Sequence, residues 1–139
     1  MTRRAIVLGL ILMGGALGVA VAQQPPLGKI EKIADNLYRI PGQGGATAVY
    51  LAGTGVVLVD TKLANNGQGI LDQVRTVTDK PISMIINTHT HGDHTGSNMF
   101  FPANVEIVTH ENTKANMEKM DVYKDPANKN GMQIGRAHV

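Results

Sequence analysis

The chain has 139 residues, which is enough for one small domain and too few for several. Its 13 basic residues barely exceed its 11 acidic ones, and Arg3, Arg4 and Arg136 lie in segments that we assign outside the domain. The remaining Lys and Arg residues form no cluster, so we expect no nucleic-acid partner. The chain has no cysteine, which excludes disulfides and thiolate metal ligands.

The N-terminus has the three parts of an export signal. Two arginines precede a nearly pure aliphatic run over residues 5–17, and Ala20-Val21-Ala22 fits a small-x-small cleavage site. We therefore predict a cleaved signal peptide over 1–22, a Pro/Gln linker over 23–29, and a periplasmic or secreted protein without membrane contact after cleavage. The alternative is an uncleaved anchor, because the aliphatic run is near the shortest length that spans a bilayer.

The first part of the domain has β-type patterns. Scattered aliphatic residues favour a short hairpin over 30–40, and a glycine-rich loop follows over 41–45. Two apolar runs, 46–51 and 56–60, are joined by a Gly-Thr-Gly turn and are expected to be strands. The second run does not alternate with polar residues, which favours a strand buried on both faces.

The middle of the domain switches to helical periodicity and back. The helical spacing of its apolar residues predicts a helix over 66–79, capped by Asn65 or Asn66. Another apolar run over 82–87 completes a strand, helix and strand in that order, which predicts parallel strands with a right-handed crossover. The helical residues that recur at this spacing are Ile70, Leu71, Val74 and Val77.

The last part of the domain predicts one more strand, over 105–108, and a helix over 111–120. Met117 and Met120 would face inward on that helix. Such methionines more often fill a core than bind a cofactor. The whole pattern predicts the α/β class.

Metal-binding side chains are concentrated directly after the strand expected at 82–87. His89, His91, Asp93 and His94 fall within one run of six residues, and imidazole and carboxylate are the ligands that zinc accepts when no thiolate is available. Gly92 would let the backbone turn without blocking the metals. The end of a strand in an α/β sheet is also where such folds place their sites. We therefore predict a metal site formed by these four residues.

The pattern His-x-His-x-Asp-His after a strand resembles the signature of the metallo-beta-lactamase fold, an αββα sandwich with a two-metal site. The Val-Val-Leu-Val-Asp-Thr motif of 56–61 and the Val-Glu-Ile-Val-Thr-His-Glu motif of 105–111 are also similar to that family. The resemblance covers roughly residues 30–125, which would be the first half of the fold.

The resemblance implies a role for each residue of the run. His89 and His91 would bind one zinc, and Asp93 and His94 a second. Asp93 would also hold the attacking hydroxide by a hydrogen bond. Asp60 would hydrogen-bond the loop that carries the ligands, or would simply cap the turn after its strand.

Two further histidines are assigned no metal. His110 is expected to end a strand or start a helix; the alternative is another ligand. His138 lies in residues 134–139, which can be encoded by ATC GGA AGA GCA CAC GTC, the start of a common sequencing adapter. We therefore expect a non-native tail there, and expect residues 30–133 to be the N-terminal part of a longer, truncated domain.

The family resemblance implies metal-activated hydrolysis of a small molecule by a zinc enzyme. The substrate would contain an ester, thioester, lactone, amide or phosphodiester, and the 139-residue chain alone would be inactive because it lacks further ligands. The alternatives are an iron-dependent oxidoreductase similar to a sulfur dioxygenase, or a metal-binding module without activity. The oligomeric state is open.

Overall fold

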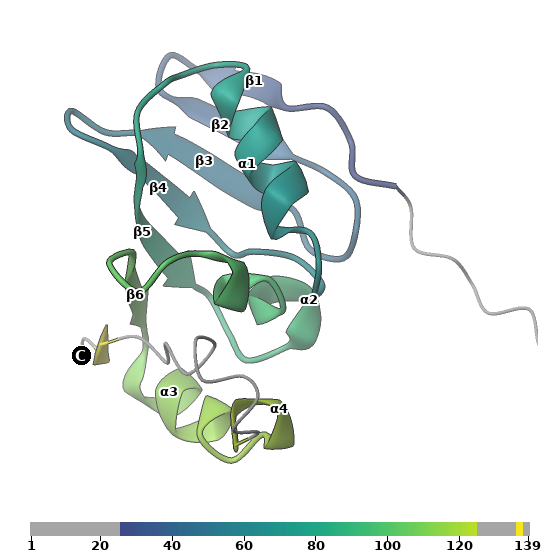
Figure 1. The fold of residues 1–139 in the computed structure, drawn as a ribbon, viewed down its shortest axis with the longest axis vertical. Coiled ribbons are helices and arrows are strands. Elements are labelled where there is room, and N and C mark those ends of the chain that lie inside the picture. The colour runs from purple at the N-terminus through teal and green to yellow at the C-terminus, as the bar shows by residue number, and fades with distance from the viewer. Residues whose placement is uncertain (1–25, 125–135, 138–139) are drawn as a thin grey trace, which may run out of the picture.

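The computed structural model describes residues 26–124 and 136–137, which form a seven-stranded sheet with helices beside it (Figure 1). The strands lie in the sheet in chain order. They are β1 (Glu31–Ala34), β2 (Leu37–Ile40), β3 (Thr47–Leu51), β4 (Val56–Val59), β5 (Ile82–Asn87), β6 (Glu106–Thr109) and β7 (Arg136–Ala137). The helices are α1 (Gly67–Arg75), α2 (Gly92–Thr95), the 3-10 turn η1 (Asn98–Phe100), α3 (Glu111–Met117) and α4 (Asp121–Lys124).

The first four strands form an antiparallel meander. β1 and β2 are joined by a turn at Asp35 and Asn36, and β3 and β4 by the Gly-Thr-Gly turn. Ala52 N–H donates to Gly55 O at 2.9 Å and closes the second turn. Both hairpins predicted from the sequence are confirmed.

The sheet becomes parallel at β4. β4 pairs with β5, and α1 connects the two, as the strand-helix-strand pattern predicts. The helix is shorter than predicted: it ends at Arg75, and the Thr76 and Val77 N–H groups then donate to the carbonyls of Gln73 and Val74, three residues earlier. Asn66 occupies the N-cap position but makes no side-chain capping bond; its side-chain NH2 donates to Leu63 O and Ala64 O.

α1 packs on one face of the sheet, in front of the central strands in Figure 1. Ile70 and Val74 join a core with residues of every strand from β2 to β6. The prediction that β4 is buried on both faces is wrong, because its burial alternates: Val56 and Leu58 are fully buried, whereas Val57 and Val59 are half-buried. Among the described residues no second layer covers that other face as α1 covers the first, so alternate side chains stay partly accessible.

The elements after β5 follow the prediction within a few residues. β6 is shifted by one position, and the predicted helix over 111–120 is divided between α3 and a turn before α4. Met117 is fully buried, as expected, and Met120 is half-buried. Residues 136–137 pair with β6, and the prediction of a non-native tail over 134–139 is not tested by this pairing.

The predicted signal peptide lies outside the described residues. Within the part that the structure describes, no helix has the length and apolar character needed to cross a bilayer.

Candidate metal centre

The predicted metal residues lie where parallel strands end at one edge of the sheet. Asp60 directly follows β4, and His89 comes two residues after β5. Because both strands run in the same direction, their carboxyl ends meet at this edge. The short helix α2 then carries Asp93 and His94 back toward β4.

The three imidazoles are packed together. The ring centroids of His89 and His91 lie 4.7 Å apart, and those of His89 and His94 lie 4.1 Å apart. His94 Nε2 is 3.6 Å from Asp93 Oδ2, a separation typical of two ligands on one metal with bonds of about 2.0–2.2 Å. The four residues of the run thus lie near one another, but His91 and Asp93 are not in the group of described residues whose ligand atoms all lie within 4.8 Å, which is Asp60, His89 and His94.

Asp60 holds the loop that carries these side chains. Its Oδ1 accepts from Thr88 N–H at 2.8 Å, and its Oδ2 accepts from the Thr88 hydroxyl at 2.7 Å. The same Oδ2 lies 2.7 Å from His94 Nδ1. The carboxylate is almost fully buried, so it has little water to compete with these partners. The hydrogen bonds to the loop are those that the family resemblance implies.

These contacts fix the tautomers of two imidazoles. The neutral His94 ring must protonate Nδ1 to donate to Asp60, which leaves Nε2 with a free lone pair. The Thr88 hydroxyl donates its single proton to Asp60. Its oxygen can therefore only accept a hydrogen bond from His89 Nδ1, 2.9 Å away. His89 is therefore also left with Nε2 free. Carboxylates that orient histidines in this way accompany metal ligands.

A buried network of hydrogen bonds holds the backbone of the run. Thr61 N–H donates to His94 O at 2.7 Å. Asn98 donates to Asn87 Oδ1 at 2.7 Å and accepts from the Thr61 hydroxyl at 2.6 Å. All three side chains are buried, so the network is expected to be rigid.

The sequence prediction assigned no role to Thr88, Asn98 or Lys62. Lys62 is fully buried, and its ammonium donates to three backbone carbonyls beside the site. Thr88 could have been noticed as a hydroxyl beside a predicted ligand. Lys62 could have been noticed as a charged residue shortly after a strand that was predicted to be buried.

His110 directly follows β6, at the same edge of the sheet, but it is not in the group of described residues whose ligand atoms lie within 4.8 Å of one another. It is the N-cap of α3, where its exposed ring accepts from Asn112 N–H at 3.1 Å. This confirms its expected place at the start of a helix. His138 lies outside the described residues.

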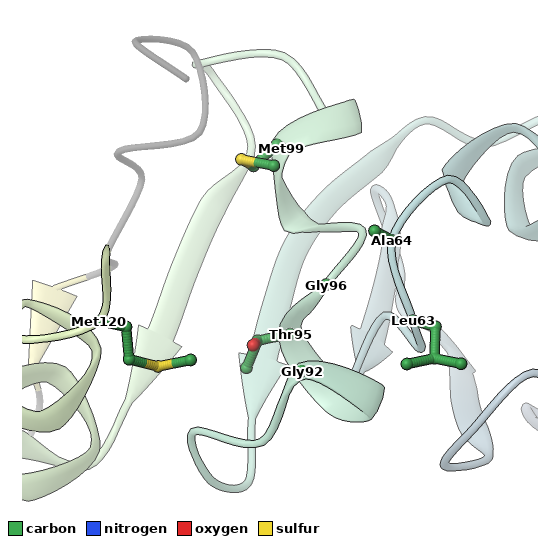
Figure 2. Close-up of a pocket in the computed structure, with 7 residues that line it drawn as sticks. All are labelled: Leu63, Ala64, Gly92, Thr95, Gly96, Met99 and Met120. Carbon is green, nitrogen blue, oxygen red and sulfur yellow. The ribbon is translucent and has the colours of Figure 1, made fainter. Parts of the chain in front are cut away.

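A pocket of about 220 Å³ adjoins α2, and Figure 2 shows the seven residues that line it. Gly92, Thr95 and Gly96 line it from one face of α2 and its C-cap, whereas Asp93 and His94 lie on the opposite face. The pocket is thus separated from the ligand atoms by α2 itself. Its other lining residues are Leu63, Ala64, Met99 and Met120.

The donor atoms fit a metal ion. Single ligand atoms of Asp60, His89 and His94 lie within 4.8 Å of one another. Asp60 is in this group by distance, but its Oδ2 is already bound to Thr88 and His94, so we assign it the positioning of ligands. Three imidazoles and a carboxylate without thiolate suit zinc and also suit iron.

The chain is similar in sequence to known proteins. The chain is 34% identical over 86 residues to the lactamase-like protein ptaB of Pestalotiopsis fici, and the match covers 52% of this chain and 26% of that protein. It is 34% identical over 89 residues to the atrochrysone carboxyl ACP thioesterase dmxR1 of a Cryptosporiopsis species, over 54% of this chain and 26% of that protein. The chain thus matches about a quarter of the length of these relatives.

A similar solved structure is a B3 metallo-beta-lactamase with an active-site glutamic acid, at a TM-score of 0.59 and 26% identity. That similarity covers 66% of this chain and 35% of the lactamase. The sheet and α1 therefore correspond to part of an α/β metallo-beta-lactamase fold. The family model described as the metallo-beta-lactamase superfamily matches residues 40–136, and the chain belongs to that superfamily.

Proposed function

We propose that the protein is an exported zinc-dependent hydrolase, with one zinc on His89 and His91 and a second on Asp93 and His94. The observation that carries the proposal is the pair of imidazoles, His89 and His94, whose Nδ1 atoms are occupied and whose Nε2 atoms are free. Zinc held by such donors acidifies water and polarises the bond that is cleaved.

The chain's own residues would orient and restrain the reacting groups. Asp60 and Thr88 fix the rings, and Asp93 presents a carboxylate 3.6 Å from His94 Nε2 that can accept a proton from a water molecule. This carboxylate is partly accessible, as a group that meets substrate must be.

The substrate class is a small molecule with an ester, thioester, lactone, amide or phosphodiester. One of the relatives above is named a thioesterase, which supports testing thioesters first. A panel of chromogenic thioester, lactone, phosphodiester and beta-lactam substrates would identify the class.

We further propose that hydrolysis requires a longer gene product than these 139 residues. A dinuclear zinc site needs roughly three protein ligands per metal, and the run supplies four in all. The matched part is 26% of each relative's length, which supports further ligands elsewhere in the protein. Recovery of the reading frame from source DNA should reveal a sequence that diverges after about Gln133 and adds His and Asp residues. A stop codon directly after Val139, or hydrolysis by this chain alone, would contradict the proposal.

Metal analysis and activity of the purified parent protein test the reaction. We expect about two zinc ions per chain, hydrolysis of one panel member, and loss of turnover in Asp93→Ala. Asp79→Ala, which removes an exposed carboxylate after α1, is the control and should keep full turnover. Bound iron with oxygen uptake would favour the oxidoreductase alternative, and retained turnover in Asp93→Ala would overturn the site.

Export is tested by N-terminal sequencing of the protein from a bacterial periplasm or culture medium. A mature chain that starts at Gln23 is expected from the Ala-Val-Ala site. A chain that retains its first 22 residues in the membrane fraction would support the anchor instead.

A further inference from the structure

Lys62 is a buried cation that the proposed reaction does not use. Its side chain is fully buried, although lysine is almost never found in this state without partners. The ammonium donates to Ile40 O at 2.7 Å, Gly42 O at 2.8 Å and Gly45 O at 2.9 Å. Its three protons are therefore all matched by carbonyls of the glycine-rich loop 41–45 and the residue before it.

That loop lies directly against the metal run. Gly45 N–H donates to Asp93 O at 3.1 Å. A Cβ atom at Gly44 would be 2.6 Å from Asp93 Cβ, and one at Gly45 would be 2.5 Å from His94 Cε1. The loop backbone is thus in contact with two of the proposed zinc ligands, with no room for side chains between them.

The loop needs an external restraint. Gly42, Gln43 and Gly44 all have positive φ, and a loop rich in glycine has many alternative conformations. Besides those of Lys62, the hydrogen bonds that tie this loop to other described residues include Gly28 N–H to Pro41 O at 2.9 Å, Gly45 N–H to Asp93 O at 3.1 Å and Leu63 N–H to Gln43 O at 3.2 Å. The Lys62 ammonium adds three hydrogen bonds, two to carbonyls of the loop and one to Ile40 O.

The backbone of Lys62 indicates that its side chain is needed. Its φ is +67°, a left-handed conformation that glycine adopts without strain and a lysine does not. Strained residues persist where the surrounding structure requires them, and they cluster at functional sites. Asp60, with φ +63°, is strained in the same segment.

Burial and, to a smaller extent, the charge of Arg39 lower the pKa of Lys62 to about 8. The amine therefore keeps its proton at neutral pH. Only the protonated form has three N–H donors for the three carbonyls.

We propose that Lys62 is a positioning residue whose ammonium holds the glycine-rich loop 41–45 against Asp93 and His94, so that the loop fixes where these two side chains present their metal-binding atoms. The effect on metal rests on the proposed function, whereas the effect on the loop does not.

The test uses Lys62→Gly and Lys62→Met in the purified protein. The glycine variant removes the ammonium but relieves the backbone strain, so it has the better prospect of folding. The control is Lys80→Met, because Lys80 Nζ also donates to a backbone carbonyl, Ala52 O at 2.8 Å, but is exposed and far along the chain from the loop.

Two measurements distinguish the effect of Lys62 on the loop from its effect on zinc binding. The first is amide hydrogen exchange at Gly45 in the metal-free protein, which reports the bond to Asp93 O. The second is the zinc dissociation constant, measured by competition with a chromophoric chelator. We expect Gly45 exchange at least about 10-fold faster and zinc binding about 10–100-fold weaker in both Lys62 variants, with no change in Lys80→Met.

Each outcome decides the proposal. Unchanged Gly45 exchange in a folded Lys62 variant would overturn the restraint of the loop, and faster exchange with unchanged zinc affinity would overturn the positioning of ligands. If neither variant folds, amide exchange at Gly45 is measured in the wild-type protein. Exchange as fast as in a free peptide would refute the proposal. Strong protection of the Gly45 amide from exchange would support it. Faster exchange in a protein that never binds zinc would keep the loop restraint and reject the proposed hydrolase.

Discussion

Asp60 is the residue on which most of the site's geometry depends. It accepts from the backbone and side chain of Thr88 and from His94, and it adopts a left-handed backbone conformation at φ +63°. A non-glycine residue in that region costs roughly 1–2 kcal/mol. The hydrogen bonds of the carboxylate offset this cost.

We predict that Asp60→Asn weakens zinc binding about 10–100-fold, because the amide cannot accept from both Thr88 and His94 as the carboxylate does. Chelator competition measures the affinity, and the ¹⁵N shifts of the imidazoles measure the tautomers. His94 should lose its fixed Nδ1–H form. Asp35→Asn, at an exposed carboxylate paired with Lys32, is the control; equal affinity in both variants would contradict the role of Asp60.

Lys62 should make stability depend on pH above neutrality. Burial lowers its pKa from 10.5 to about 8, so between these values the unfolded chain binds more protons than the folded one. Stability contributed by this group therefore rises as the pH increases from 8 to 10.5, by at most about 3 kcal/mol. Below pH 8 both states are protonated and the contribution is constant.

The measurement compares the free energy of unfolding of the wild type and Lys62→Met across this range of pH. The difference between the two should move in favour of the wild type as the pH rises. A difference that is flat, or that moves toward the variant, would show that the folded pKa is not lowered.

At the scale of elements, the loop 41–45 and α2 form one packed unit. A Cβ at Gly45 would lie 2.5 Å from His94 Cε1 and 2.7 Å from His94 Nε2, so a larger residue there would require the ring or the loop to shift. The packing of a loop on a four-residue helix thus controls the direction of a proposed ligand.

We predict that Gly45→Ala displaces the His94 ring and weakens zinc binding at least about tenfold, with a loss of stability of about 1–3 kcal/mol from overpacking. Gly53→Ala is the matched control, because a Cβ at Gly53 has nothing within 4 Å. Equal zinc affinity in the two variants would mean that the loop does not restrain His94.

At the scale of the whole molecule, the two faces of the sheet differ. α1 covers one face, and the other carries a partly exposed apolar row across paired strands. Tyr50 is 47% exposed and Ile86 is 36% exposed. Exposed apolar sheet surface of this kind promotes association.

We predict that the 139-residue chain expressed alone self-associates at micromolar concentration, and that Tyr50→Lys with Ile86→Lys reduces this association. Light scattering after size-exclusion chromatography measures the mass. Thr54→Lys, at the exposed turn between β3 and β4, adds charge without touching the face and is the control. A monomeric wild-type chain would contradict the prediction.

The sequence by itself predicted most of the elements and the closeness of the four residues of the run, whereas their binding of metal stays a prediction. Apolar periodicity placed α1 between β4 and β5, and the spacing of His89, His91, Asp93 and His94 predicted that they would lie together, because these are properties of local sequence. It placed helix ends less well, since the last turn of α1 closes in hydrogen bonds to carbonyls three residues earlier, which apolar periodicity does not specify.

Only the tertiary structure decided how those residues are held. Lys62 meets carbonyls that are 17 to 22 positions away in the chain, and Asp60 meets Thr88 and His94 across 28 and 34 positions. No local pattern specifies such contacts, because they arise where the ends of strands and the loops between them meet in the folded sheet. The burial of Lys62 likewise depends on which loop folds over it. The spacing of residues along the chain does not specify that loop.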